Sequence, residues 1–208
     1  GLCLVGSEMC IRDRARGATA NVSLTFSGVS TAVSEFTLSK NTTFTSNINN
    51  RTFTFVTPED NIIKNVANTF NQAITITEGV PITHEFVVSE ASPVQYILPN
   101  ENVDTRSIRV TVKESSSSSA NTVYTQATNI RAVNQKTAVY YLQETSDKQF
   151  EILFGSGPLG KPVKDGNIVQ IDYRVCNGTQ TNGANVFSID SLSICLLYTS
   201  DAADELCR

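Results

Sequence analysis

The sequence predicts a mainly β protein, with short antiparallel strands in one or two sandwich-like or barrel-like β domains and little helix. Apolar residues alternate with Thr, Ser, Asn and charged residues in short runs, so that each run has one buried and one solvated face. The runs recur at about the 8–12-residue spacing typical of sandwiches and barrels. β-Branched and aromatic residues are enriched in them, and Asn, Gly and Pro separate them.

The alternation predicts strands over 21–26, 52–56, 73–77, 84–89, 94–98, 107–114, 122–128, 138–144, 149–154 and 167–175. One helix is predicted over 58–70. Its first turn would contain Pro58, Glu59 and Asp60. Its apolar residues recur at helical spacing, and they are Ile62, Ile63, Val66 and Phe70.

Three segments are expected to be loops: the serine run 115–119, the Asn- and Gly-rich stretch 179–185, and the polar stretch 37–50, which we expect to be a long excursion. A domain boundary is expected between Thr77 and Pro81, where Glu78 and Gly79 mark a turn. We therefore expect an N-terminal β-rich segment over 15–78 and a second β domain over 79–194.

The two ends of the chain are interpreted as foreign to the protein. Residues 9–14 and 195–200 are what a transposon end used in sequencing adapters encodes on its two complementary strands, and the flanking residues continue the match. We therefore interpret 1–14 and 195–208 as adapter-derived, and the protein as an internal piece over about 15–194. The alternative, a signal-peptide core over 2–11 and an acidic tail over 201–208, does not explain the complementarity.

Composition excludes several functional classes. Without the two ends, 13 basic and 15 acidic residues remain, and this near balance gives no electrostatic reason to bind nucleic acid or an anionic membrane. The longest apolar runs fall far below the roughly 20 residues that span a bilayer. Only Cys176 and His84 remain as cysteine and histidine, so no disulfide or zinc cluster is expected.

A GxGxxG pattern over 155–160, followed by Lys161, is typical of phosphate-binding loops in isolation. That chemistry needs the glycines to lead into a helix whose N–H groups point at the phosphate. Pro162, Gly166 and an alternating strand follow instead. We therefore predict a glycine-rich β-hairpin connection, in which Gly155, Gly157, Gly160 and Gly166 permit positive φ.

Two catalytic arrangements can be assembled from the composition. A nucleophilic triad would use His84 with Asp104 or Asp172, but no serine lies in a Gly-x-Ser-x-Gly elbow. A glycosidase pair would use Glu144 and Glu151, but the sequence has no Trp to line a sugar site. Four glycosylation sequons begin at Asn21, Asn41, Asn50 and Asn177, and we assign them no function. No catalytic, cofactor-binding or metal-binding residue is predicted.

Residues 81–185 resemble the baseplate wedge proteins of T4-like phages and, more distantly, the J-type baseplate proteins of other contractile tails. The matching segments are 78–88, 97–100, 102–105 and 139–144. The most specific piece is Phe154-Gly155-Ser156-Gly157-Pro158-Leu159-Gly160-Lys161, followed by 166–169, 173–174, 177–178 and 182–185. Ser156 stands where the family usually has Asp or Asn, and serine caps the same turn more weakly.

The resemblance implies a structural protein of the virion tail baseplate, made in the host bacterial cytoplasm, with no catalytic residues and no cofactor. Its partners would be other baseplate wedge subunits and copies of itself, and not nucleic acid, a membrane or a small-molecule substrate. Two alternatives stay open: a tail-fibre or adhesin-type receptor-binding module, and a cell-wall glycan hydrolase.

Overall fold

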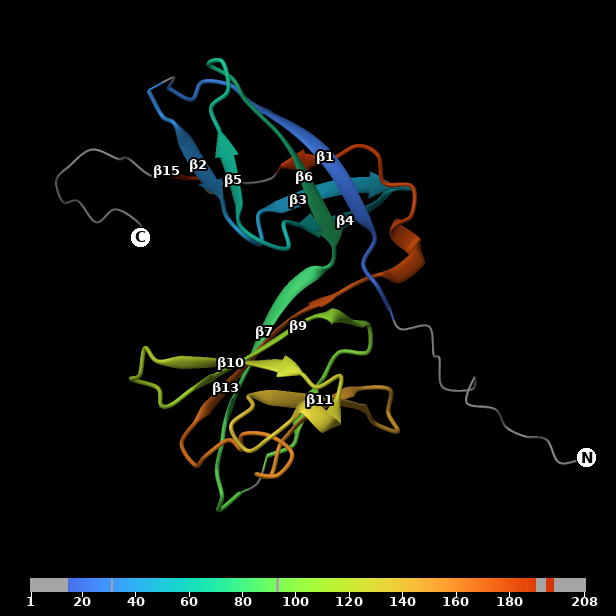
Figure 1. Ribbon diagram of the computed structural model, residues 1–208. Coiled ribbons are helices and arrows are strands. Elements are labelled where there is room, and N and C mark those ends of the chain that lie inside the picture. The colour runs from blue at the N-terminus through green and yellow to red at the C-terminus, as the bar shows by residue number, and fades with distance from the viewer. Residues whose placement is uncertain (1–14, 31, 93, 190–193, 197–208) are drawn as a thin grey trace, which may run out of the picture. The chain divides into compact units, whose positions relative to one another are not determined.

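The computed structural model describes residues 15–30, 32–92, 94–189 and 194–196. The contact pattern divides the chain into two compact units (Figure 1). The first unit contains Pro81–Cys176, and the second contains Gly17–Val80 together with the described residues from Asn177 onward. The chain passes from the second unit to the first after Val80 and returns after Cys176, so 177–189 group with the N-terminal unit.

The first unit is one seven-stranded sheet with the order β7-β13-β9-β10-β11-β12-β8. Its strands are β7 (Val80–Val87), β8 (Tyr96–Leu98), β9 (Val103–Lys113), β10 (Asn121–Gln126), β11 (Val139–Glu144), β12 (Phe150–Phe154) and β13 (Ile168–Val175). β10 and β11 pair in parallel, whereas β13–β9, β9–β10, β11–β12 and β12–β8 pair antiparallel.

Aromatic rings bring the two edge strands of this sheet together. Phe86 of β7 and Tyr96 of β8 contact each other edge to face, with ring centroids 5.5 Å apart. Tyr96 also contacts Phe154, and Phe154 contacts Tyr124, in the same geometry. The sheet therefore curves into a nearly closed barrel. The inward residues that are fully buried include Leu98, Val103, Val110, Ile152, Val169 and Ile171.

The second unit contains two sheets. The five-stranded sheet has the order β1-β6-β4-β3-β14, and the three-stranded sheet has the order β15-β2-β5. Their strands are β1 (Thr19–Phe26), β2 (Glu35–Leu38), β3 (Thr43–Ile48), β4 (Arg51–Val56), β5 (Asn61–Lys64), β6 (Phe70–Glu78), β14 (Ser188–Ile189) and β15 (Ile194–Leu196). The core is rich in phenylalanine, with Phe36, Phe44, Phe55 and Phe70 almost fully buried.

The prediction of a mainly β protein with little helix is confirmed. Each of the ten predicted strands corresponds to an observed strand, namely β1, β4 and β6 through β13. The predicted loop over 115–119 joins β9 to β10, and the predicted loop over 179–185 overlaps a short 3-10 turn, η3 (Gly178–Thr181). The other 3-10 turn in the described residues is η2 (Ile130–Ala132).

The predicted helix over 58–70 is wrong. Residues 61–64 form β5, which pairs with β2. Ile63 is fully buried and its neighbour Ile62 is 55% exposed, which is strand alternation and not a helical stripe. The chain then reverses at Ala67 and Asn68, whose φ angles of 52° and 63° fit a two-residue type I′ hairpin turn.

The expectation of a long excursion over 37–50 is also wrong. This stretch contains the end of β2 and all of β3, and β3 pairs with β4 in a hairpin that reverses at Asn49 and Asn50, which both have positive φ. Phe44 and Ser46 face the interior, while Thr43 and Thr45 are more exposed. Polar residues at the outward positions of a strand gave this stretch its loop-like composition.

The glycine segment does not join adjacent strands, so the predicted β-hairpin connection is wrong. β12 and β13 are separated by β11, β10 and β9 in the sheet, and 155–167 is a crossover. Within it Gly157 and Gly160 exchange two backbone hydrogen bonds of 3.2 Å and both have positive φ, as does Gly166. Gly155 is needed for a different reason: a Cβ there would lie 2.4 Å from the Leu159 carbonyl oxygen.

Candidate functional site

The residues of the possible nucleophilic triad form separate contacts. The His84 ring stacks with Phe86 and Tyr173, with centroids 5.7 and 6.4 Å away. Asp172 accepts a hydrogen bond of 2.6 Å from the Thr83 hydroxyl. Asp104 is buried and forms an ion pair with Arg174 at 3.4 Å. Within the described residues, no hydrogen bond or ion pair joins His84 to Asp104 or Asp172.

Glu144 and Glu151 lie on neighbouring strands of one hairpin. Glu151 of β12 opposes Gln143 of β11, while Glu144 opposes Phe150. Because adjacent strand residues project to opposite faces of a sheet, the two carboxylates do not face each other across a cleft. The arrangement does not form a glycosidase pair.

The segment 155–161 does not precede a helix, since residues 161–167 are irregular and β13 follows. It instead packs against the start of β11. The Lys161 N–H donates to the Thr137 carbonyl at 2.8 Å, and the Tyr141 hydroxyl donates to the Leu159 carbonyl at 3.1 Å. The phosphate-loop interpretation therefore lacks the helix N-terminus that it requires.

The four sequon asparagines have local structural roles. Asn41 and Asn50 adopt positive φ in turns, a conformation that asparagine tolerates better than most residues. The Asn21 side chain accepts a hydrogen bond of 2.9 Å from the Thr75 hydroxyl on the paired strand. Asn177 binds a buried carboxylate, described next.

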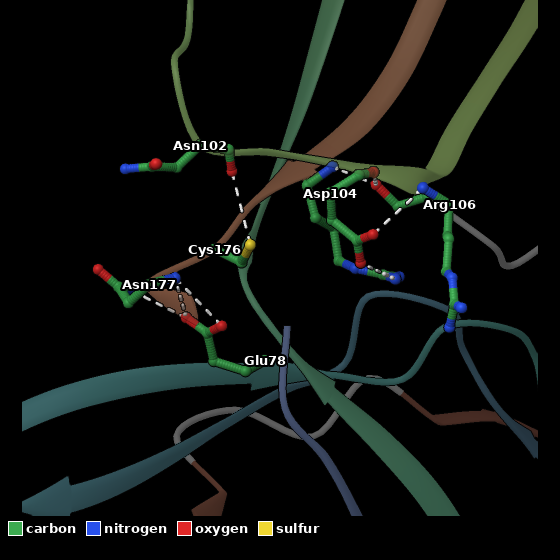
Figure 2. Close-up of polar contacts among 8 residues, drawn as sticks. Glu78, Asn102, Asp104, Arg106, Cys176 and Asn177 are labelled. Atoms are coloured by element: carbon green, nitrogen blue, oxygen red, sulfur yellow. Dashed lines mark hydrogen bonds and ion pairs between the residues drawn. The ribbon is translucent and has the colours of Figure 1, made fainter. Parts of the chain in front are cut away.

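Glu78, at the end of β6, is a fully buried carboxylate. Figure 2 shows it beside Asn177, where its two oxygens accept from the Asn177 backbone N–H at 3.0 and 3.2 Å, and Oε1 also accepts from the Asn177 side-chain amide at 2.8 Å. The Glu78 N–H donates to the Ala18 carbonyl at 2.8 Å. Glu78 thus links, inside the second unit, the end of β6, where the chain leaves this unit, to Asn177, where it returns.

In the first unit a large bulge interrupts β9. Its residues 105–108 stand opposite the single Tyr173 of β13, because Asp172 pairs with Arg109 and Arg174 pairs with Asp104. Ser107 holds the bulge: its hydroxyl donates to the Asp104 carbonyl at 2.6 Å and accepts from the Arg174 N–H at 2.8 Å.

Asp104 also stabilises this bulge. One carboxylate oxygen accepts from the Arg106 backbone N–H at 3.2 Å, and the other pairs with the Arg174 guanidinium (Figure 2). Directly after β13, Cys176 is buried. Its N–H and its thiol both donate to the Asn102 carbonyl oxygen, at 3.0 and 3.5 Å. These contacts fix where the bulged segment leaves the sheet.

The bulge borders an open depression of about 390 Å³ on the barrel, which we call the arginine depression. Its lining is Thr105, Arg106, Ile108, Arg109, Val123, Tyr124, Thr125, Gln126 and Tyr140. Burial raises the pKa of the Tyr124 and Tyr140 phenols above their ordinary value, so both stay neutral at physiological pH.

Sequence analysis missed the arginine depression. Arg106 and Arg109 are three residues apart, a spacing that puts two residues of a regular strand on opposite faces. They line one depression because Arg106 lies within the bulge, where the regular alternation of the strand is lost. Two arginines at this spacing within a strand are a weak signal, and nothing else in the sequence marks the bulge.

Within the described residues, no three His, Cys, Asp or Glu side chains are grouped so that they could hold a metal ion. In the same part of the chain the structure contains no helix with the length and apolar composition that crossing a membrane requires.

The geometry defines a β-rich protein of two sheet-built units. Residues 82–186, just over half of the chain, match the family model of the bacteriophage baseplate wedge protein gp6, third domain. The chain therefore belongs to the gp6 baseplate wedge family, which confirms the resemblance to phage baseplate wedge proteins. Its role is that of a structural protein of the phage baseplate. No curated protein matches the sequence.

Proposed function

We propose that this chain acts by subunit association in the wedges and ring of the tail baseplate and catalyses no reaction. Its partners are other baseplate wedge subunits and copies of itself, and its place is the virion tail baseplate after synthesis in the host cytoplasm. The observation that carries this proposal is the gp6 family match over 82–186. The placement of Glu144 and Glu151 on opposite faces of one hairpin agrees with it.

Strand β1 supports association through a sheet edge. It is an edge strand of eight residues that pairs only with β6 in the sheet order, and it contains no charge, Pro or Gly. Edge strand β7, by contrast, contains Pro81, which cannot donate to a new ladder, and the exposed Glu85. An unprotected edge strand is a template for adding a strand from another chain.

The test is sedimentation velocity of the full chain, alone and with the other wedge proteins encoded beside it. We expect co-sedimentation with those proteins. Thr25→Lys places a charge on the exposed face of β1 and is expected to weaken the complex. The matched control is Thr52→Lys on β4, an interior strand, where the complex is expected to persist. A chain that sediments as a monodisperse monomer and binds none of the wedge proteins would contradict the proposal.

A further inference from the structure

The arginine depression contains two guanidinium groups, of Arg106 and of Arg109, which stands opposite Asp172 in the strand register. The guanidinium groups of Arg106 and Arg109 form no ion pair or hydrogen bond within the described residues, and both residues are exposed. Only the Arg106 backbone N–H is engaged, on Asp104, and in Figure 2 no dashed line reaches its guanidinium. The bulge thus presents two guanidinium groups at one open site.

Guanidinium groups select carboxylates and phosphates because their planar fork donates two parallel hydrogen bonds. The whole chain has a net charge of −4, which disfavours a polyanion such as nucleic acid. The neutral part of the lining, Val123, Thr125 and Gln126, suits a polypeptide that brings both apolar and polar groups. A carboxylate-bearing loop of a protein is therefore the occupant that fits.

The same unit provides such a loop. The turn of the β11–β12 hairpin contains the exposed Asp147, and Glu151 follows on β12, with Lys148 as the one basic residue between them. The hairpin turn follows the C-terminal end of β11, whereas the arginine depression includes Tyr140 near its start. The acidic and basic surfaces thus lie toward opposite ends of one strand.

We propose that the arginine depression of one copy receives the acidic β11–β12 hairpin of a second copy. This inference rests on the self-association in the proposed function and assigns the surface for it. Because the two contact surfaces differ, the contact is heterologous and repeats from copy to copy, so that it closes a ring or extends a filament. Charge complementarity of this kind makes association depend strongly on ionic strength.

The test is a charge exchange followed by sedimentation velocity of the full chain. The double variant Arg106→Glu/Arg109→Glu and the double variant Asp147→Arg/Glu151→Arg are each expected to weaken self-association about tenfold or more. An equimolar mixture of the two is expected to associate again, because each reversed surface then meets its complement. Raising the salt from about 0.05 to about 0.5 M is expected to weaken the wild-type contact.

The control matched to the arginine variant is Lys136→Glu/Lys164→Glu, which makes the same change in net charge at exposed sites outside both surfaces. It is expected to self-associate like the wild type. Unfolding curves of all variants verify that they fold. A wild-type chain that stays monomeric, arginine variants that self-associate like the wild type, or a mixture that fails to restore association would each overturn the inference. Binding to other wedge proteins would still support the proposed function in all three cases.

Discussion

Glu78 illustrates how one residue determines the local structure of this chain. A buried carboxylate is costly unless hydrogen bonds replace its hydration, and here Asn177 provides three such contacts from 99 positions along the chain. The sequence marked Glu78 and Gly79 as a turn, but it contained no signal of the burial or of the partner. Contacts this distant depend on the completed fold, and local patterns do not specify them.

Replacing Glu78 with glutamine tests this contact. Glu78→Gln keeps the side-chain volume but puts an NH2 group where one oxygen accepts from Asn177, so a donor faces a donor. We expect the free energy of unfolding to fall by about 1–3 kcal/mol. The measurement is urea unfolding of the full chain.

The control for this substitution is Glu90→Gln, since Glu90 is exposed and, among the described residues, its backbone N–H alone forms a hydrogen bond, to Asp165. Its effect should stay within about 0.5 kcal/mol. Equal stability of the two variants would show that the Glu78 contacts contribute nothing.

At the scale of elements, alternation located every strand of eight or more residues but only some of the shorter ones. β9 and β13 have enough alternating residues to be recognised, but β5 has four residues, and its apolar residues also fit a helical period when Val66 and Phe70 are counted. β3 was not recognised as a strand because its outward-facing residues are polar. Periodicity is therefore ambiguous where a strand is short or its outward face is wholly polar.

The neighbours Ile62 and Ile63 distinguish strand from helix by experiment. In the strand, Ile63 is fully buried and Ile62 is more than half exposed, so Ile63→Ala should destabilise the protein by about 2–5 kcal/mol. Ile62→Ala, the same chemical change one residue away, should cost about 0.5 kcal/mol or less. Thermal and urea unfolding of both variants measure the difference. Comparable large losses of unfolding free energy at both positions would instead favour the amphipathic helix over 58–70.

At the scale of the whole molecule, strand content was predictable and strand order was not. Consecutive strands are neighbours in about two thirds of cases, so a hairpin was the reasonable expectation for β12 and β13. The crossover over 155–167 depends instead on β9, β10 and β11 lying between them. Similarly, the return of 177–189 to the N-terminal unit follows from long-range pairing such as that of β14 with β3. The arginine depression was not predicted, because it depends on the bulge in β9, which the sequence does not mark.

The central claim is that this chain is a structural part of a phage tail baseplate. Cryo-electron microscopy of the parent virion, with antibody fragments raised against the full chain as markers, tests it most directly. We expect the fragments to decorate the baseplate at the end of the tail tube, in a repeating ring, in disrupted particles whose wedges are accessible. Decoration of the fibre tips, or particles that contain no copy of the chain, would contradict the account.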